Sequence, residues 1–388
     1  MVINQVYEFV NEATKEAIGD SAVLNEDLSN VIDIGTAIFN ANAYDKYVKA
    51  LVNRIGRTIF VNRVYQGTAP SVMMDGWEYG SVMQKVSGNL PEATVNETWE
   101  LQDNQSYDPH VFHQPKGTVV KFFNNYVTFE VDMSFTEDQL KMSFNSATEL
   151  NGFVSMLYTN VENSMTVKID ELIRRTINNM IAETIHDDYK SGAYSASSGV
   201  KAINLLKLYN DTLGEGATAL TVGNAMTNKD FIRFAAYQIK LTHDHMRSMS
   251  TLFNIGKQPR FTPKDLCHIA LLANFSSAAD VFLQSNTFHD ELSALPTAET
   301  VPYWQGSGTK FQFNDVSAID VKSTSGATVK LSGILGVMFD RWALGVSNIN
   351  RKVTSQWTPN AEFFTNFYKY KAGFFNDLNE NFVVFFIA

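Results

Sequence analysis

The sequence is poor in cysteine, and this limits the chemistry open to it. Cys267 is the only cysteine in 388 residues, so a disulfide within the chain and a metal site built on several thiolates are excluded. Cys267 stands in the apolar run LCHIALLA, where we expect a small buried hydrophobe and not a reactive thiol. A chain of this length can bury a core of good size without a staple, and it would usually split into two or three structural units.

Clustered positive charge is also lacking. The formal net charge is −10, and the excess of acid lies in the first half of the chain. Residues 1–56 carry eight acidic and four basic side chains, and residues 58–120 carry seven and three. A protein that reads duplex DNA normally displaces counterions with a stripe of Lys and Arg. The composition therefore argues against sequence-specific nucleic-acid binding.

No apolar run approaches the length that is needed to span a bilayer. The first twenty residues, MVINQVYEFVNEATKEAIGD, are acidic and amphipathic, which is not the pattern of a signal peptide. We therefore expect a soluble intracellular product with no membrane partner.

Motifs of catalysis and metal binding are missing as well. His243 and His245 stand two residues apart, so on a helix they face away from each other, and His110 and His113 are bracketed by prolines in a polar stretch. The segment QGSGTK at 305–310 lacks the ending of a phosphate loop, and no Gly-x-Ser-x-Gly elbow occurs. We predict no catalytic, cofactor-binding or metal-binding residues, and no enzyme activity.

Two periodicities are strong. In VTFEVDMSF, residues 127–135, apolar and polar side chains alternate strictly, which predicts a strand with one buried face. From about Ala147 to about Tyr189 the apolar residues step by three and four without a proline, which predicts a helix on the order of 60 Å long. Its apolar stripe is wider than a coiled-coil seam. A beam of this kind suits a flat or elongated domain.

Residues 58–120 are polar and punctuated by Gly, Pro, Asn and Asp, which predicts a long two-stranded excursion from the domain. Such a hairpin is marginal alone and needs a neighbour. Trp77, Tyr79 and Trp99 carry amphipathic rings suited to that contact. Upstream, residues 43–56 have helical spacing, and the arm that precedes them is too thin in apolar residues to fold alone.

Beyond a small-residue linker at 190–199, the sequence indicates mixed α/β structure to about Gly336. Thr227, with Asp230 three residues later, predicts a capping box before a helix. LCHIALLA is a buried-strand candidate, and residues 309–323 and 327–339 are further strand material.

Three blocks of the sequence together resemble the major capsid proteins of tailed bacteriophages. They are FFNNYVTFEVDMSFTEDQLKMSFNSATELNGFVSMLYTNVENSMTVKIDELIRRTINNMI (122–181), HIALLANFSSAADVFLQSNTFHDELSALPTAETVPYWQGSG (268–308) and LGVMFDRWALGVSNINRKVTSQWTPNAEFFTNFYKYKAGFFNDLNENFVVF (335–385). Their order matches the family's pattern, and they span most of the chain after residue 120. This fold is shared with encapsulins and herpesvirus shells.

The resemblance implies an α+β fold with five segments. These would be an N-terminal arm (1–57), an extended loop lying across the adjacent subunit (58–120), a peripheral domain with a long spine helix (121–190), an axial domain (191–336) and the return of the chain to the peripheral domain (337–388). Candidate contacts between subunits are Trp77, Tyr79, Lys85 and Trp99. Some relatives form a covalent bond from a lysine on this loop, but no motif around Lys85 supports that reaction here.

The resemblance also implies a structural protein that self-assembles, as hexamers and pentamers, into the icosahedral shell around a phage double-stranded DNA genome. The virion would be its location, and the host cytoplasm the place of assembly. The chain begins almost directly with the arm, so we expect a separate scaffolding protein beside a portal protein. A mildly acidic subunit would contact packaged DNA only non-specifically. The alternatives are an encapsulin-like compartment shell, which genome neighbours would reveal, and an intracellular α/β enzyme, which a well-formed polar pocket would support.

The last 28 residues concentrate aromatic side chains where chain ends are usually loose and polar. Ten aromatic residues lie between Ala361 and Phe386. The resemblance implies that this segment closes the peripheral sheet over the spine helix, with FVVFFI completing that sheet. At ~25 cal/mol per Å2, several buried rings contribute several kcal/mol before entropy is subtracted.

We therefore predict that truncation before Phe382 abolishes solubility, because it exposes the surface that these rings cover. The measurement is the soluble fraction after expression of residues 1–381 beside the full chain. Recovery of a soluble truncated chain that still assembles would contradict the prediction.

Overall fold

The computed structural model describes residues 3–19, 24–25, 29–41, 43, 46–47, 50, 69–74, 83–88, 118–136, 147–190, 192–214, 217–284, 297–306 and 310–388. The helices are α1 (Ile3–Ile18), α2 (Val31–Asn40), α5 (Ala147–Asp188), α6 (Leu205–Thr212), α7 (Val222–Ala225), α8 (Lys229–Met246), α9 (Ala273–Gln284) and α10 (Phe313–Val316), with 3-10 turns η1 (Pro70–Val72) and η3 (Lys264–Leu266). The strands are β1 (Met73–Met74), β2 (Met83–Gly88), β3 (Thr118–Phe123), β4 (Tyr126–Thr136), β5 (Ala202–Asn204), β6 (Cys267–Leu272), β7 (Glu299–Val301), β8 (Ile319–Lys322), β9 (Thr328–Leu331), β10 (Ile334–Asp340), β11 (Leu344–Thr358), β12 (Phe363–Asn376) and β13 (Phe382–Phe386).

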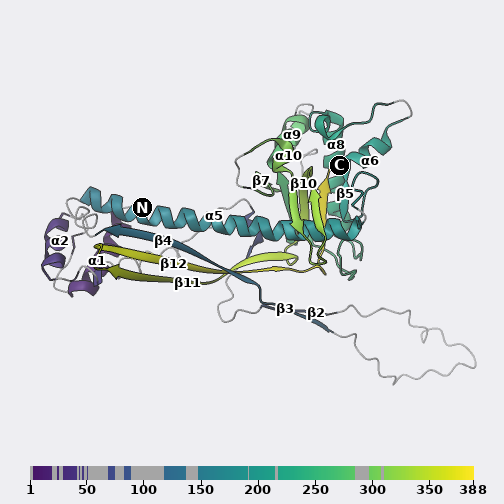
Figure 1. The fold of residues 1–388 in the computed structure, drawn as a ribbon. Helices are drawn as coiled ribbons and strands as arrows, with labels where there is room; N and C mark the ends of the chain where they lie inside the picture. Colours follow the sequence, from purple (N-terminus) through teal and green to yellow (C-terminus); the bar gives the residue numbers. More distant parts are fainter. Residues whose placement is uncertain are drawn as a thin grey trace, which may run out of the picture.

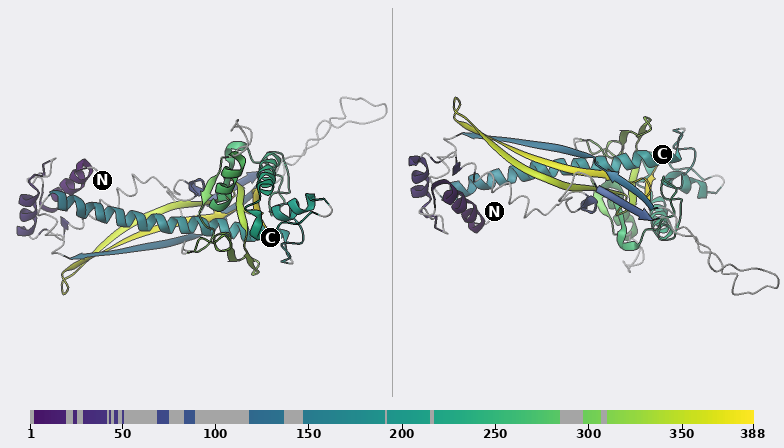
Figure 2. Two further views of the ribbon diagram at one scale, coloured as in Figure 1. Left: turned by 90° about the horizontal axis from the view of Figure 1, so that it is seen from above. Right: turned by 90° about the horizontal axis from the view of Figure 1, so that it is seen from below.

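The molecule is elongated and is built along α5. This helix has 42 residues, which confirms the predicted beam and corresponds to about 63 Å at ~1.5 Å per residue. A long four-stranded sheet lies under most of its length, and a five-stranded sheet with its own helices rises at its C-terminal end (Figure 1). Figure 2 shows the same arrangement from above and below, with α1 and α2 at the opposite end.

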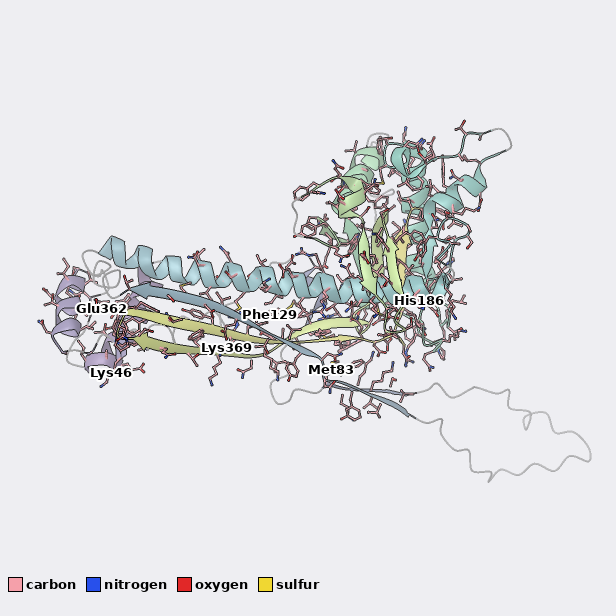
Figure 3. The ribbon with its side chains drawn as sticks, in the orientation of Figure 1. Lys46, Met83, Phe129, His186, Glu362 and Lys369 are labelled. Carbon is pink, nitrogen blue, oxygen red and sulfur yellow. The ribbon has the colours of Figure 1, made fainter. Side chains whose placement is uncertain are left out.

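The four-stranded sheet has the order β1-β11-β12-β4. The alternating sequence at 127–135 lies in β4, as predicted, and pairs antiparallel with β12. From Phe364 to Ala372 every second residue of β12 is buried, among them Tyr368 and Tyr370, because successive side chains of a strand point to opposite faces and one face of this strand meets α5. Figure 3 labels Phe129 and Lys369 on this sheet and Glu362 at its far tip.

The five-stranded sheet has the order β5-β13-β10-β6-β7. The last strand, β13, pairs antiparallel with β10 and parallel with β5. The prediction that FVVFFI completes the same sheet as residues 363–376 is therefore wrong. All five residues of β13 are buried, and a strand that is covered on both faces needs a central place in a sheet, which the half-exposed four-stranded sheet does not offer.

A second core fills the space between the five-stranded sheet and helices α6, α8 and α9, and it includes Phe231, Ile239 and Phe275. The helix predicted after Thr227 is α8, but its cap is Asn228, whose side chain accepts from the backbone N–H of Phe231. The predicted capping box is therefore wrong. The hydroxyl of Thr227 instead donates to the Asn224 carbonyl, and an Asn at the next position is an equally good cap.

In the described part of the N-terminal arm, α1 and α2 do not stand alone. Val10 and Ala13 of α1 and Ile34 and Ile38 of α2 are buried in the core that contains α5. These few apolar residues suffice because α5 supplies the rest of the surface. Most of the helix predicted at 43–56 lies outside the described residues. Within the described part of the chain, no helix has the length and hydropathy that a membrane span requires.

The excursion predicted at 58–120 is confirmed at its base. β2 and β3 form a two-stranded antiparallel pair that leaves the body below the four-stranded sheet (Figure 1). Met83, at the start of β2, is labelled there in Figure 3. Pairing continues to Phe123, three residues past the predicted boundary at 120, because Phe123 packs on Phe375 with ring centroids 5.1 Å apart.

We predict that Ile177→Ala strongly destabilises the fold, because Ile177 is fully buried on α5 in the core shared with both sheets. Truncation of a buried Ile costs about 2–5 kcal/mol. The measurement is the midpoint of urea unfolding. The matched control is Val167→Ala on the same helix, where the side chain is 55% exposed and the change should be about 0.5 kcal/mol or less. Equal effects of the two substitutions would contradict the account of α5 as the shared beam.

Candidate functional site: the junction of hairpin, sheets and helix

The described residues give little support for a catalytic site or a metal site. Within them, no three or more His, Cys, Asp or Glu side chains are grouped as metal ligands would be. His243 is buried on α8 beside Asp244, whereas His110 and His113 lie outside the described residues. Burial, with the nearby Asp340 carboxylate, raises the pKa of the Cys267 thiol to about 12, so this thiol stays protonated near neutral pH.

Among the described residues, a group of charges lies where the hairpin base meets the body. Lys85 Nζ of β2 lies 2.7 Å from Asp377 Oδ2 and 2.8 Å from Glu380 Oε1. Lys121 Nζ of β3 lies 2.6 Å from Asp377 Oδ1. Arg260 Nε approaches the same Glu380 oxygen at 3.5 Å. We call these five residues the ion cluster.

The acidic half of the ion cluster sits in the turn that joins the two sheets. β12 of one sheet ends at Asn376, and β13 of the other begins at Phe382, so residues 377–381 are the link. This turn is held on several sides: Asp377 N–H donates to the Ala343 carbonyl at 2.7 Å, and Gly256 N–H donates to the Leu378 carbonyl at 2.9 Å. Because the hairpin lysines pair with this held turn, the direction of the hairpin is fixed relative to the link between the two sheets.

The link is also tied to the helix and to the loop before β6. Asn376 Nδ2 donates to the Thr176 carbonyl of α5 at 3.2 Å. Asn381 Nδ2 donates to Thr262 Oγ1 at 3.1 Å, and Thr262 Oγ1 donates to Asp340 Oδ2 at 2.9 Å. Thr262, Asp340 and Asn381 are buried, and hydrogen bonds between buried polar groups favour one arrangement.

Pairing of the hairpin strands brings the two lysines together. Lys85 and Lys121 are direct partners in the β2–β3 register, and like charges directly opposite each other are destabilising. Asp377 removes this conflict, because each of its two carboxylate oxygens accepts from one lysine. The Asp377 side chain is only 2% exposed, so its charge is balanced by partners and not by water.

The same contacts set the protonation of Asp377. Burial alone would raise the pKa of this carboxyl, but hydrogen bonds from Lys121 and Lys85 outweigh burial and hold the pKa below its ordinary value. Asp377 is therefore charged throughout the neutral range, and the ion cluster is intact there.

The opposite face of the hairpin base is apolar. Val86 and Phe122 are 58% and 64% exposed, and Val120 lies between them on the same face at 42%. In an ordinary antiparallel pair of strands, the apolar face packs on the body of the protein and the charged face is exposed to solvent. Here the order is reversed: Lys85 and Lys121 point to the body, and the three apolar side chains point away from it.

Of the four predicted contact residues, the structure places one. Lys85 is 14% exposed and engages acidic side chains of its own chain, while Trp77, Tyr79 and Trp99 lie outside the described residues. Their role between subunits stays a prediction.

Sequence reasoning missed the other members of the ion cluster, which are Lys121, Arg260, Asp377 and Glu380. One signal was available: NDLNEN, residues 376–381, is the one polar interruption in the aromatic C-terminal segment. Residues 260 and 121 carry no comparable local mark, because their place depends on strand register and on a distant loop.

We predict that Asp377→Asn lowers the stability of the chain at pH 7. The difference in urea midpoint between the natural chain and this variant, which we call the gap, should disappear in acid. The folded pKa lies below the unfolded value, so the charged carboxylate stabilises the fold above about pH 4 and loses this effect as pH falls through the folded pKa. Urea midpoints across pH 2–7 give the measurement. Asp320→Asn, at a carboxylate that is 54% exposed, is the control and should show little gap at any pH. A gap for Asp377→Asn that persists unchanged at pH 2 would contradict this assignment.

Solved structures resemble this architecture. A chain in the structure of the head fiber and inner core protein gp22 of native bacteriophage P68 is 9% identical, with a TM-score of 0.51, over 84% of this chain and 86% of that chain. A chain in the capsid structure of Staphylococcus phage Andhra is also 9% identical, with a TM-score of 0.49 and the same coverages. At such identity the likeness to the P68 chain shows the fold alone. No curated protein sequence matches the chain.

A match to a protein-family model shows the family to which the chain belongs. The model of the Phi29-like phage major capsid protein matches residues 8–386, which is nearly the whole sequence. It spans the arm, the hairpin, α5 and both sheets, and so includes every element that carries the ion cluster. The chain belongs to the Phi29-like phage major capsid protein family and is a structural protein of the capsid shell.

Proposed function

We propose that copies of this chain build the shell by covering the outward face of each hairpin base with a neighbouring copy. The family assignment makes the chain a component of the virion that assembles from copies of itself. The contact that we assign is the apolar face of Val86, Val120 and Phe122.

The observation that carries this proposal is the reversed polarity of the hairpin base. A protein that finishes folding alone hides apolar side chains and exposes charged ones. This hairpin turns its lysines inward, at 14% and 31% exposure, and leaves a valine pair and a phenylalanine to water. Exposed apolar patches of this kind mark protein–protein contacts.

The wider assembly follows from the same reading. We propose closed hexamers and pentamers of the chain, formed in the host cytoplasm on a separate scaffolding protein and around a portal protein, without catalysis by the chain. Packaged DNA would be touched without sequence preference, because the net charge of −10 gives the wall little hold on phosphates. The division into an arm (1–57), an extended loop (58–120), a peripheral domain with the spine helix (121–190), an axial domain (191–336) and a returning segment (337–388) is part of this proposal, with β13 of the returning segment placed in the five-stranded sheet.

Heterologous contacts of one patch with a different patch close into rings when the rotation between copies closes. A hairpin that leaves the body, as β2 and β3 do in Figure 1, is suited to such a contact. The alternative of an encapsulin-like compartment shares this mode of assembly and is not favoured by the family match.

We predict that Phe122→Ser strongly reduces particle formation and leaves the fold intact. The ring is 64% exposed, so its loss leaves no cavity in the subunit but removes apolar area from the contact. Electron microscopy and sedimentation of the purified chain measure the particles, and circular dichroism checks the fold.

Phe311→Ser is the matched control, because this ring is 66% exposed but lies outside the hairpin. Particles in normal yield from Phe122→Ser, or an equal loss from both substitutions, would contradict the assignment of the hairpin face as the contact.

A further inference from the structure

Among the described residues, the hairpin base is attached to the body at its root and through the ion cluster. At its root, β3 ends at Phe123 and β4 begins at Tyr126, so a joint of two residues, Asn124 and Asn125, separates them. The joint is anchored on the sheet, because Phe374 N–H donates to the Asn125 carbonyl at 3.1 Å. Beyond the joint, the hairpin strands pair with each other and belong to neither large sheet.

The second attachment is the ion cluster, and it is electrostatic. It joins Lys85 and Lys121 of the hairpin to Asp377 and Glu380 of the link between the sheets, and Arg260 shares Glu380 from the loop before β6. Lys85 Nζ also donates to the Trp342 carbonyl at 3.2 Å. A ring contact, Phe123 on Phe375, lies at the root itself, next to the joint.

Charged contacts and apolar contacts differ in the free energy that their separation costs. When an apolar face leaves its site, its area returns to water at full cost. When lysines and carboxylates separate, water solvates each of them and recovers much of the lost energy. The lysines sit directly opposite each other, so their mutual repulsion adds to the tendency to leave once Asp377 no longer holds both.

We propose that the ion cluster is a releasable latch that sets the direction of the hairpin. With the latch closed, the hairpin takes the direction in Figure 1; with it open, the hairpin swings about Asn124 and Asn125. Use of the latch in the shell rests on the proposed function, since a chain that serves both hexamers and pentamers must aim one hairpin at neighbours in different positions. The latch itself is a property of the single chain.

The test measures the direction of the hairpin in the full-length chain in solution. Cys267→Ala gives a background without cysteine, and spin labels are placed by Gly88→Cys and Val167→Cys. At Gly88 an added Cβ meets no atom within 4 Å, and Val167 is 55% exposed on α5. Gly88 pairs with Thr118, six residues from the joint, which is about 20 Å at ~3.3 Å per residue. A swing of about 30° therefore moves the label by about 10 Å.

We expect a narrow distance distribution for the closed latch. Lys85→Glu with Lys121→Glu should broaden it and shift its mean by roughly the 10 Å given by the strand rise. Adding Asp377→Lys and Glu380→Lys to that variant exchanges the charges and should narrow the distribution again. Lys369→Gln, which breaks the exposed pair with Glu130 on the sheet, is the matched control and should change nothing.

A second label pair checks the body. Val167→Cys with Val281→Cys joins α5 to α9, both at exposed positions, and should report one distance in every variant. If the reversed lysines disturb this pair, a salt series on the natural ion cluster decides the matter, and broadening of the Gly88 distribution toward 1 M salt is expected. A Gly88 distribution that stays narrow and unshifted, with the lysines reversed in an intact body or at 1 M salt, would overturn the latch. Because it is read on single chains, this result is independent of whether the chain forms shells.

Discussion

The structure depends on covering the apolar face of α5. A helix of 42 residues with buried residues from Val161 to Ile185 is stable only if apolar surface meets it throughout, because helical propensity alone contributes little. β12 and β13 supply that surface at different places on the helix, although they are consecutive in the chain. The aromatic C-terminal segment thus contributes one strand to each sheet and packs both sheets against the shared helix, and we call this segment the clamp.

The position of the clamp explains the polar turn within it. A chain that leaves one sheet for another must turn at residues 377–381, and that turn cannot be apolar, since its backbone groups and side chains face several elements at once. The carboxylates of Asp377 and Glu380 draw two lysines of the hairpin inward. The apolar side chains of the hairpin are consequently left outside, where a neighbouring copy can cover them.

The sequence was informative where the pattern is local and long. The helix at 147–188, the strand at 126–136 and the antiparallel excursion follow from periodicity and from turn residues. The sequence does not reveal a strand's place in a sheet when that place depends on distant partners. FVVFFI is apolar enough for either sheet, and its pairing with β10 and β5 determines that it lies in the five-stranded sheet. The cap at Asn228 was missed because Thr227 beside it carries the same signal. Of the candidate site, Lys85 was singled out, but the other four residues of the ion cluster come from three other segments that the hairpin register and the fold bring together.

We propose that copies of this chain complete one another through the outward face of the hairpin base. Cryo-electron microscopy of particles formed by the purified full-length chain tests it most directly. The account predicts closed shells in which Val86 and Phe122 are covered by an adjacent copy while Lys85 stays paired with Asp377 in its own chain. Shells in which this face remains open to solvent, or a chain that stays monomeric under all assembly conditions, would contradict it.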